Sequence, residues 1–219
     1  MRTLALKQAM FFPLGAMVAL MLVGLTVHGY SSASQQMSEL GLLAGYPAVL
    51  EAVLAIIVGV SIIVFGLGLI GHPYGRFAFT AGTSIVFGVS MLSNGIFHMG
   101  SPLHRMYAIG FAVILTPVLF VAELHASLQT QTLRTISKWV AVITLFYFWA
   151  TITRLDPNGF QGLTQRIAVI IMFGWFSYAS YAIVAQQSKG RCDAFCYFFS
   201  GGLTTHSSGC AARAAKFRR

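Results

Sequence analysis

Charged side chains are scarce in this sequence. Of its 219 residues 9% are charged and five are acidic, whereas about 25% of the residues of an ordinary soluble domain are charged. Hydrophobic residues make up 57% of the chain, and the mean hydropathy is +0.76. Because so few polar side chains cannot cover the surface of a soluble 23.7 kDa protein, the composition excludes a soluble globular fold and predicts a polytopic membrane protein.

Cysteine is also scarce, and Cys192, Cys196 and Cys210 all lie in the last 28 residues. The apolar part of the chain therefore has no disulfide and no cysteine nucleophile. The sequence also lacks a phosphate-binding glycine loop and a Gly-x-Ser-x-Gly nucleophile elbow, which argues against ATP-driven transport and serine hydrolysis within this chain. The net charge of +9 comes from basic residues between the apolar runs and in the tail. This distribution predicts lipid contact and no nucleic-acid partner.

Six apolar stretches are long enough to cross a bilayer core of about 30 Å, which takes about 20 residues per helix. They are separated by turn sequences rich in Gly and Pro, and Pro117 predicts a kink in the fourth. We predict an all-α transmembrane bundle of six helices within residues 1–187, followed by a disordered cytoplasmic tail, basic and containing Cys, Gly and Ser, over 188–219. The six stretches are 9–27, 47–70, 78–99, 106–126, 138–154 and 165–186.

The distribution of basic residues predicts the orientation of the bundle. Eleven of the fourteen Lys and Arg residues lie on the side of the termini, whereas Arg105, Arg154 and Arg166 lie on the other side. Since cytoplasmic loops are enriched in Lys and Arg, both termini are predicted to be cytoplasmic, with the loop around 28–46 outside the plasma (inner) membrane. The first stretch also fits a cleaved signal peptide, with small residues at Ser32 and Ser34.

Two short motifs carry a resemblance to a known family. The loop after the first stretch holds Ser38-Glu39-Leu40-Gly41, and the third stretch ends in Gly95-Ile96-Phe97-His98-Met99-Gly100, followed by Leu103-His104. Over about residues 10–186 the chain resembles the DUF998 family of small prokaryotic membrane proteins. Relatives usually have Pro where His98 stands and Asp where Gly100 stands. The resemblance implies about six helices and a plasma-membrane location, but no activity.

Polar residues on the third stretch are the first candidates for a binding site. Ser90, Asn94 and His98 are spaced at i, i+4 and i+8 and so share one helix face. They have two interpretations, hydrogen bonding between helices or the wall of an outward-facing cavity into which His104 also projects.

Glu51 lies about one turn inside the second stretch, where an ionised carboxylate is costly unless it is paired. Its candidate partners are Arg105, Arg154, Arg166, His98 and His104. An interfacial position would let it hydrate instead. Glu39 either caps a short helix or contacts a ligand.

The remaining candidates have weaker patterns. Thr144, Tyr147, Thr151 and Arg154 share one face of the fifth stretch, which indicates helix packing or a hydroxyl-rich substrate path. Glu123 and His125 close the fourth stretch, where we expect interfacial side chains or proton handling. The tail has the residue types of a structural zinc site, at a spacing that matches no known zinc motif. These residues are Cys192, Cys196, His206 and Cys210.

The sequence predicts a non-enzymatic protein without a cofactor that binds or transports a small molecule or a lipid head group through an outward-facing polar cavity. One alternative is a metal-dependent membrane hydrolase that acts on lipid with Glu39, Glu51, His98 and His104. Another is a structural partner of a second membrane protein, or a homo-oligomer, which docks through the Gly-rich faces of the second and third stretches. The predicted cavity residues are Glu39, Glu51, Ser90, Asn94, His98, His104 and Arg154.

Overall fold

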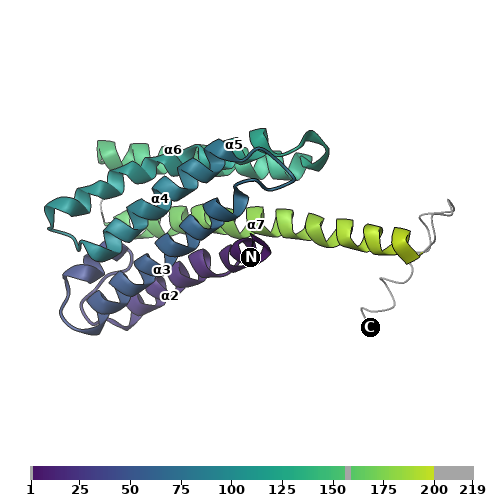
Figure 1. The fold of residues 1–219 in the computed structure, drawn as a ribbon. Helices are drawn as coiled ribbons and strands as arrows, with labels where there is room; N and C mark the ends of the chain where they lie inside the picture. Colours follow the sequence, from purple (N-terminus) through teal and green to yellow (C-terminus); the bar gives the residue numbers. More distant parts are fainter. Residues whose placement is uncertain (1, 156–158, 200–219) are drawn as a thin grey trace. The chain divides into compact units, whose positions relative to one another are not determined.

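The computed structural model describes residues 2–155 and 159–199, and the side chains among them other than those of 105–107 and 188–199. This part of the chain contains helices and their connections and no β-strand, so the all-α prediction is confirmed for it (Figure 1). The elements are α1 (Arg2–Ala9), α2 (Phe12–Thr26), the 3-10 helix η1 (Met37–Leu42), α3 (Tyr46–Leu69), α4 (Ala78–Ile96), the 3-10 helix η2 (Pro102–Ile114), α5 (Thr116–Glu123), the 3-10 helix η3 (Ala126–Leu128), α6 (Gln131–Thr153) and α7 (Gln161–Phe199).

Six helical segments are long and apolar enough to cross a membrane, which confirms the predicted number in the described part of the chain. The chain is therefore a multi-pass membrane protein. Two predicted boundaries were wrong, because basic residues occupy the ends of the helices: the first segment begins at Arg2 rather than 9, and the fifth at Gln131 rather than 138. The segments are Arg2–Thr26, Tyr46–Leu69, Ala78–Ile96, Pro102–Glu123, Gln131–Thr153 and Gln161–Gln187.

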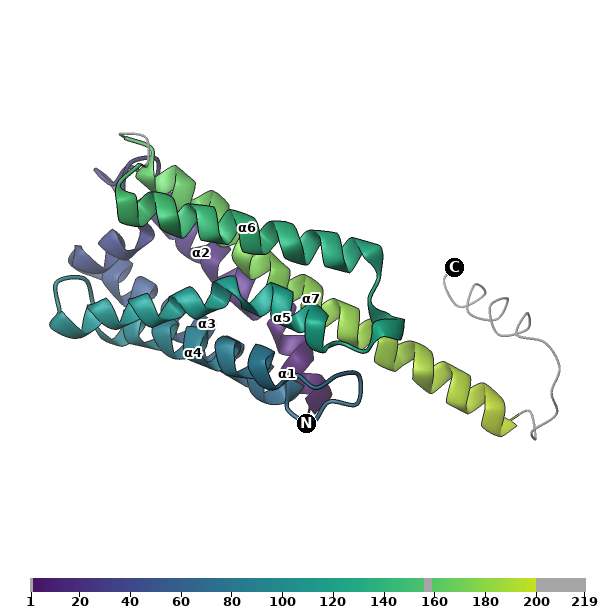
Figure 2. The same ribbon diagram turned by 90° about the horizontal axis from the view of Figure 1, so that it is seen from above.

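The chain divides into two compact units, Met1–Tyr181 and Ala182–Arg219. In the first unit, α6 and the adjoining part of α7 lie side by side in both views (Figures 1 and 2). In the second unit, the helix continues to Phe199. Residues 188–199, for which the sequence predicted disorder, are therefore helical, whereas 200–219 lie outside the described residues. The division at Gln187 between membrane domain and tail stays a prediction.

Proline sets the start of several helices. Pro13, Pro47, Pro102 and Pro117 each occupy one of the first two positions of their helix. Proline fits there because the first helical N–H groups have no partner within the helix. The kink predicted at Pro117 takes the form of a change of helix type, from the 3-10 helix η2 to the α-helix α5.

Helices α3 and α4 pack backbone against backbone through glycine. A Cβ atom built at Gly59 would lie 2.7 Å from the carbonyl oxygen of Gly88, and one built at Gly88 would lie 2.7 Å from that of Gly59. A Cβ atom at Gly95 would lie 2.7 Å from the Ala52 oxygen. Small residues permit this approach in membrane helices. The Gly-rich faces that the sequence offered for docking onto another protein are thus occupied within the chain.

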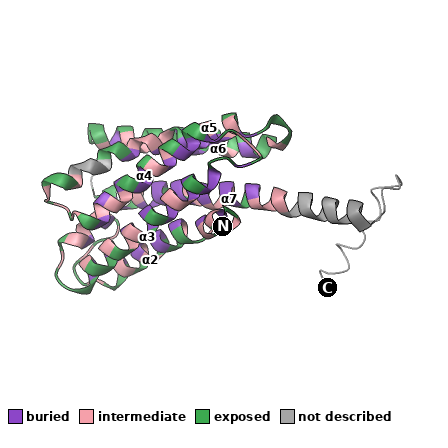
Figure 3. Ribbon diagram, in the orientation of Figure 1, coloured by how far each residue is buried: buried purple, intermediate pink, exposed green. Residues whose placement is uncertain are grey.

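The interior of the first unit is aromatic, and much of its outside is apolar. Phe65, Phe120, Trp175 and Phe176 are fully buried, and the indole N–H of Trp175 donates to the Ser137 hydroxyl at 3.0 Å. Figure 3 shows exposed positions on the outward sides of the helices. Many of these are large apolar side chains, for example Phe146, which is 64% exposed. Such faces are suited to contact with the lipid bilayer.

Candidate functional site

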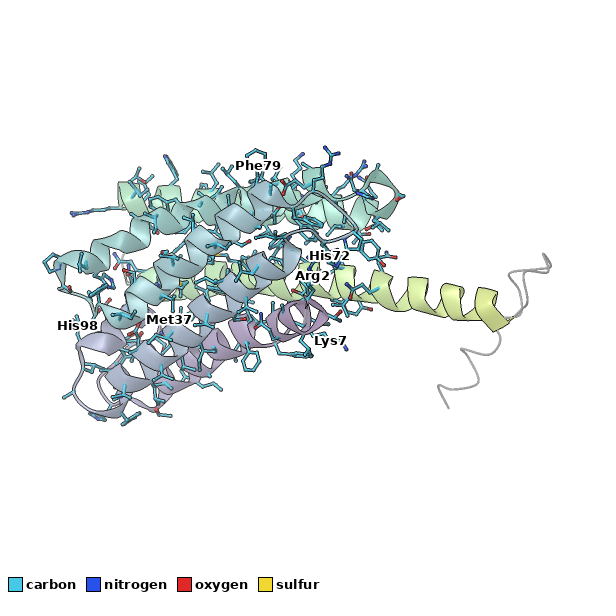
Figure 4. The ribbon with its side chains drawn as sticks, in the orientation of Figure 1. Arg2, Lys7, Met37, His72, Phe79 and His98 are labelled. Carbon is cyan, nitrogen blue, oxygen red and sulfur yellow. The ribbon has the colours of Figure 1, made fainter. Side chains whose placement is uncertain are left out.

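The bundle has two ends, which we name after a glutamate at each. The Glu51 end holds the loops 27–45 and 97–101, and the Glu123 end holds the loops 70–77 and 124–130. Figure 4 shows Met37 and His98 at the Glu51 end, and Arg2 and His72 at the opposite end.

A cavity of about 300 Å³ lies at the Glu51 end. Seven helical elements of the first unit line it, namely α2, η1, α3, α4, η2, α6 and α7. Four of the predicted residues, Glu51, Ser90, Asn94 and His104, are in its wall. The structure therefore brings together one carboxylate, one amide, one hydroxyl and one imidazole. The remaining polar lining residues are Gln36, Ser38, Tyr147, Thr151 and Gln165.

Glu51 is 3% exposed, near the start of α3. Its Oε1 accepts a hydrogen bond of 3.2 Å from Nδ2 of Asn94 on α4. A Cβ atom at Gly41 would lie 3.1 Å from Oε2 of Glu51, so glycine leaves room for the carboxylate there. Among the described side chains none forms an ion pair with Glu51. The sequence suggested five such partners, and Arg105 is the one whose side chain lies outside the described residues.

Helix α4 and the 3-10 helix η2 contribute Ser90, Asn94 and His104 to the wall. Ser90 and Asn94 lie on adjacent turns of α4, as their spacing predicted. Nδ1 of His104 lies 2.7 Å from the carbonyl oxygen of Phe97. Because a carbonyl oxygen only accepts, Nδ1 carries a proton and donates it in this contact. The hydrogen bond fixes the orientation of the imidazole ring.

Helices α6 and α7 also supply polar residues to the cavity wall. The sequence patterns had indicated some of them only weakly and others not at all. Tyr147 and Thr151 line the cavity, so the fifth stretch presents its hydroxyl-bearing face to it. Gln165, which was missed, accepts a 2.8 Å hydrogen bond from the Met37 backbone N–H through its Oε1. The sequence signal that could have identified Gln165 is a polar amide near the start of an otherwise apolar helix. Gln36 and Ser38 were missed because loop residues carry no periodicity.

Three predicted cavity residues lie elsewhere. Oε1 of Glu39 accepts a 2.8 Å hydrogen bond from the Gln36 backbone N–H within a capping box, so Glu39 closes the start of η1. His98 is exposed and is not part of the lining, because α4 ends at Ile96 before the third repeat of its polar face. Arg154 is exposed at the C-cap of α6, with a φ angle of 54°. The structure therefore does not bring these three residues to the cavity.

A buried arginine, not predicted as a site residue, ties the loop at the Glu51 end to α7. Arg166 is 8% exposed and donates to the carbonyl oxygens of Gln35, at 3.0 Å, and Gly162, at 2.8 Å. It also donates to the Tyr30 hydroxyl at 2.8 Å. Burial raises the pKa of Tyr30, and the hydrogen bond with Arg166 opposes this shift. Arg166 is absent from the cavity lining, so it acts as a clamp on the loop.

The residues proposed for metal binding do not form one site. Among the described residues, no group of three His, Cys, Asp or Glu side chains is placed to hold a metal ion. Glu51 and His104 share the cavity, but Glu39 and His98 do not. The tail alternative falls outside the described side chains; its residues are Cys192, Cys196, His206 and Cys210.

At the Glu123 end, Glu123 has a structural role that the sequence did not reveal. Its two oxygens accept hydrogen bonds of 2.8 Å from the backbone N–H groups of Phe79 and Thr80 and one of 2.6 Å from the Thr80 hydroxyl. These groups belong to the first turn of α4, whose N–H groups have no partner within the helix. Glu123 therefore caps α4 from α5, across 43 residues of sequence.

A comparison with known proteins assigns the chain to a family. The DUF998 family model, described as a protein of unknown function, matches residues 12–182. No curated protein and no solved structure matches the chain. The matched region covers most of the chain and includes every residue that lines the cavity. The chain therefore belongs to the DUF998 family.

Proposed function

We propose that this protein binds a small molecule or a lipid head group in the cavity at the Glu51 end, as a binding protein or as the binding step of a transporter. The observation that carries the proposal is the shared cavity of Glu51, Ser90, Asn94 and His104, on three separate elements. Its volume of about 300 Å³ lies at the small end of the range of ligand sites. Ionisable residues within membrane segments are costly and therefore mark functional sites.

The lining supports binding rather than helix packing alone. Polar side chains that only join helices form contacts across a filled interface, whereas these four surround space. The described wall also contains a second, apolar set of side chains, which includes Met37, Met91 and Phe173. A cavity that is mostly apolar with a few convergent polar groups is typical of a small-molecule site.

The distribution of basic residues supports an outward orientation of this cavity. Arg2 and Lys7 lie at the Glu123 end (Figure 4), and basic residues favour the cytoplasmic side of a membrane. The test uses a variant without tail cysteines and a membrane-impermeant maleimide on intact cells. We expect labelling of Ala44→Cys and no labelling of Ser127→Cys until the cells are opened. The reverse pattern would contradict this orientation.

Native mass spectrometry of the full-length protein, released from detergent, tests the binding function. The wild type should retain about one small molecule or lipid per chain. Met91→Trp places a large side chain in the cavity wall and should remove that species. The control Leu22→Trp adds the same side chain at an exposed position of α2 and should retain it. A wild type without a bound species, or the same species on both variants, would overturn the proposed function.

A further inference from the structure

The described part of the cavity wall has a carboxylate and no Lys or Arg to balance it. Glu51 is the one acidic residue among the described lining residues, and these include no Lys or Arg. The nearby Arg166 is directed at the carbonyl oxygens of Gln35 and Gly162 and at the Tyr30 hydroxyl. Arg154 is exposed at the end of α6. A buried carboxylate requires a compensating positive group or hydrogen-bond donors, and the described side chains supply a single amide.

The hydrogen bond from Asn94 determines which polar groups remain for a ligand. A carboxylate oxygen accepts, so Asn94 turns its NH₂ group toward Glu51. The side-chain oxygen Oδ1 of Asn94 accepts no hydrogen bond from the described residues. The carboxylate of Glu51 and this amide oxygen together form an acceptor pair, which suits a group with positive charge and N–H donors.

The rest of the wall favours a cation on an apolar body. Aromatic rings attract cations through the negative charge of their faces. Methionine side chains are polarizable and adapt to different apolar shapes. The aromatic and methionine residues of the lining are Phe87, Phe111, Tyr147, Phe148, Phe173, Met17, Met37, Met91, Met99 and Met172.

We propose that the occupant of this cavity carries an ammonium group on an apolar body, with Glu51 as its counterion. This inference rests on the proposed binding function and names its ligand class. The acceptor pair of Glu51 and Asn94 holds the ammonium group, and the aromatic and methionine side chains cover the apolar part. A free organic amine and a lipid with an amine head group share this chemistry.

The test measures binding of radiolabelled benzylammonium, which has both a positive charge and N–H donors, to the full-length protein in detergent, with empty micelles as the blank. Ethylbenzene has the same shape with a methyl group in place of the ammonium group, and benzenesulfonate carries the opposite charge. We expect saturable binding of the cation and at least tenfold weaker competition by the two other compounds. Glu51→Gln should weaken binding at least tenfold, and Glu51→Asp should retain more affinity than Glu51→Gln.

Two control variants separate the counterion from general effects of substitution. Glu39→Gln removes a carboxylate at the same end of the bundle but outside the cavity, and His98→Gln changes an exposed residue. Both should bind the cation as the wild type does. Gel filtration checks that each variant is folded.

Mass spectrometry of the retained lipids distinguishes the two sources of the ligand. Release of an amine-bearing lipid by the cation identifies the lipid, whereas saturable binding without lipid release identifies a free amine; both support the inference.

Equal competition by ethylbenzene, an unchanged affinity in Glu51→Gln, or no saturable binding of the cation would overturn it. In these cases a species that native mass spectrometry finds on the wild type and not on Met91→Trp leaves the proposed binding function intact.

Discussion

Two glutamates at opposite ends of the bundle have different surroundings. Glu123 receives three hydrogen bonds from the first turn of α4. Glu51 receives one, from Asn94, although it is 3% exposed. Glu123 thus completes the backbone hydrogen bonding of a helix, whereas Glu51 lines a cavity with part of its hydrogen-bonding capacity unused by the described residues.

Glu123 is therefore a structural carboxylate, whereas Glu51 is a candidate for binding a ligand. The first turn of a helix carries partial positive charge and free N–H groups, so a carboxylate there stabilises the fold. A buried carboxylate with a single amide partner destabilises the fold through lost hydration. The number of donors around each carboxylate, rather than burial alone, distinguishes the structural carboxylate from the candidate for binding.

The largest expected effect concerns Arg166, the buried arginine at the Glu51 end. Arg166→Met removes three hydrogen bonds, of which two hold the loop at the Glu51 end and one lies within α7. We expect a loss of about 3 kcal/mol in the free energy of unfolding, measured by denaturation in micelles. The control Arg154→Met, at an exposed position, should change this free energy by less than about 0.5 kcal/mol.

A double-mutant cycle of Arg166→Met and Glu51→Gln then asks whether the two charges interact. The two changes should be additive within about 0.5 kcal/mol. A larger coupling would identify Arg166 as the counterion of Glu51 and contradict the account.

The next effect concerns Glu123. Glu123→Gln leaves first-turn N–H groups of α4 with a weaker acceptor, and we expect a loss of about 2 kcal/mol in the free energy of unfolding. Hydrogen exchange should rise at the start of α4 and stay unchanged around the cavity. Unchanged protection of Phe79 and Thr80 would show that the cap does not stabilise the helix.

Glu51→Gln has a smaller expected effect, of opposite sign. Removing a buried charge while keeping the shape of the side chain should leave the ligand-free protein as stable as the wild type, or more stable by up to about 1 kcal/mol. Thermal denaturation in the same micelles measures this. A loss of more than about 2 kcal/mol would mean that Glu51 has a structural role like that of Glu123.

The smallest effect is pH dependence at the Glu123 end. Burial lowers the pKa of His72, and the nearby Arg2 adds to the shift. Nδ1 of His72 accepts a hydrogen bond of 3.4 Å from the Tyr74 backbone N–H, an interaction of the neutral ring. Because the unfolded chain takes up the proton first, stability should fall as the pH drops below about 6.5. The slope of melting temperature against pH should be smaller in His72→Gln, and an equal slope would exclude His72 as the cause.

Sequence patterns predicted the fold better than the site. Helix number follows from long apolar runs, and the shared face of Ser90 and Asn94 follows from helical periodicity. The pattern failed at His98, because the helix ends two residues earlier. It also could not show that Arg166 bonds to Gln35 across 131 residues, or that Glu123 reaches α4. Such contacts depend on how loops and helices meet, which periodicity does not encode.

The central claim is that Glu51 gives an accessible cavity a preference for cations. The most direct measurement compares modification rates of Thr151→Cys by cationic and anionic methanethiosulfonates of similar size, in a variant without tail cysteines. Thr151 lines the cavity, whereas the control position Thr153 on the same helix is exposed outside it. The account predicts a cation preference at Thr151→Cys that falls when Glu51→Gln is added and no such fall at Thr153→Cys. An unreactive Thr151→Cys, or a preference that persists without the Glu51 charge, would contradict it.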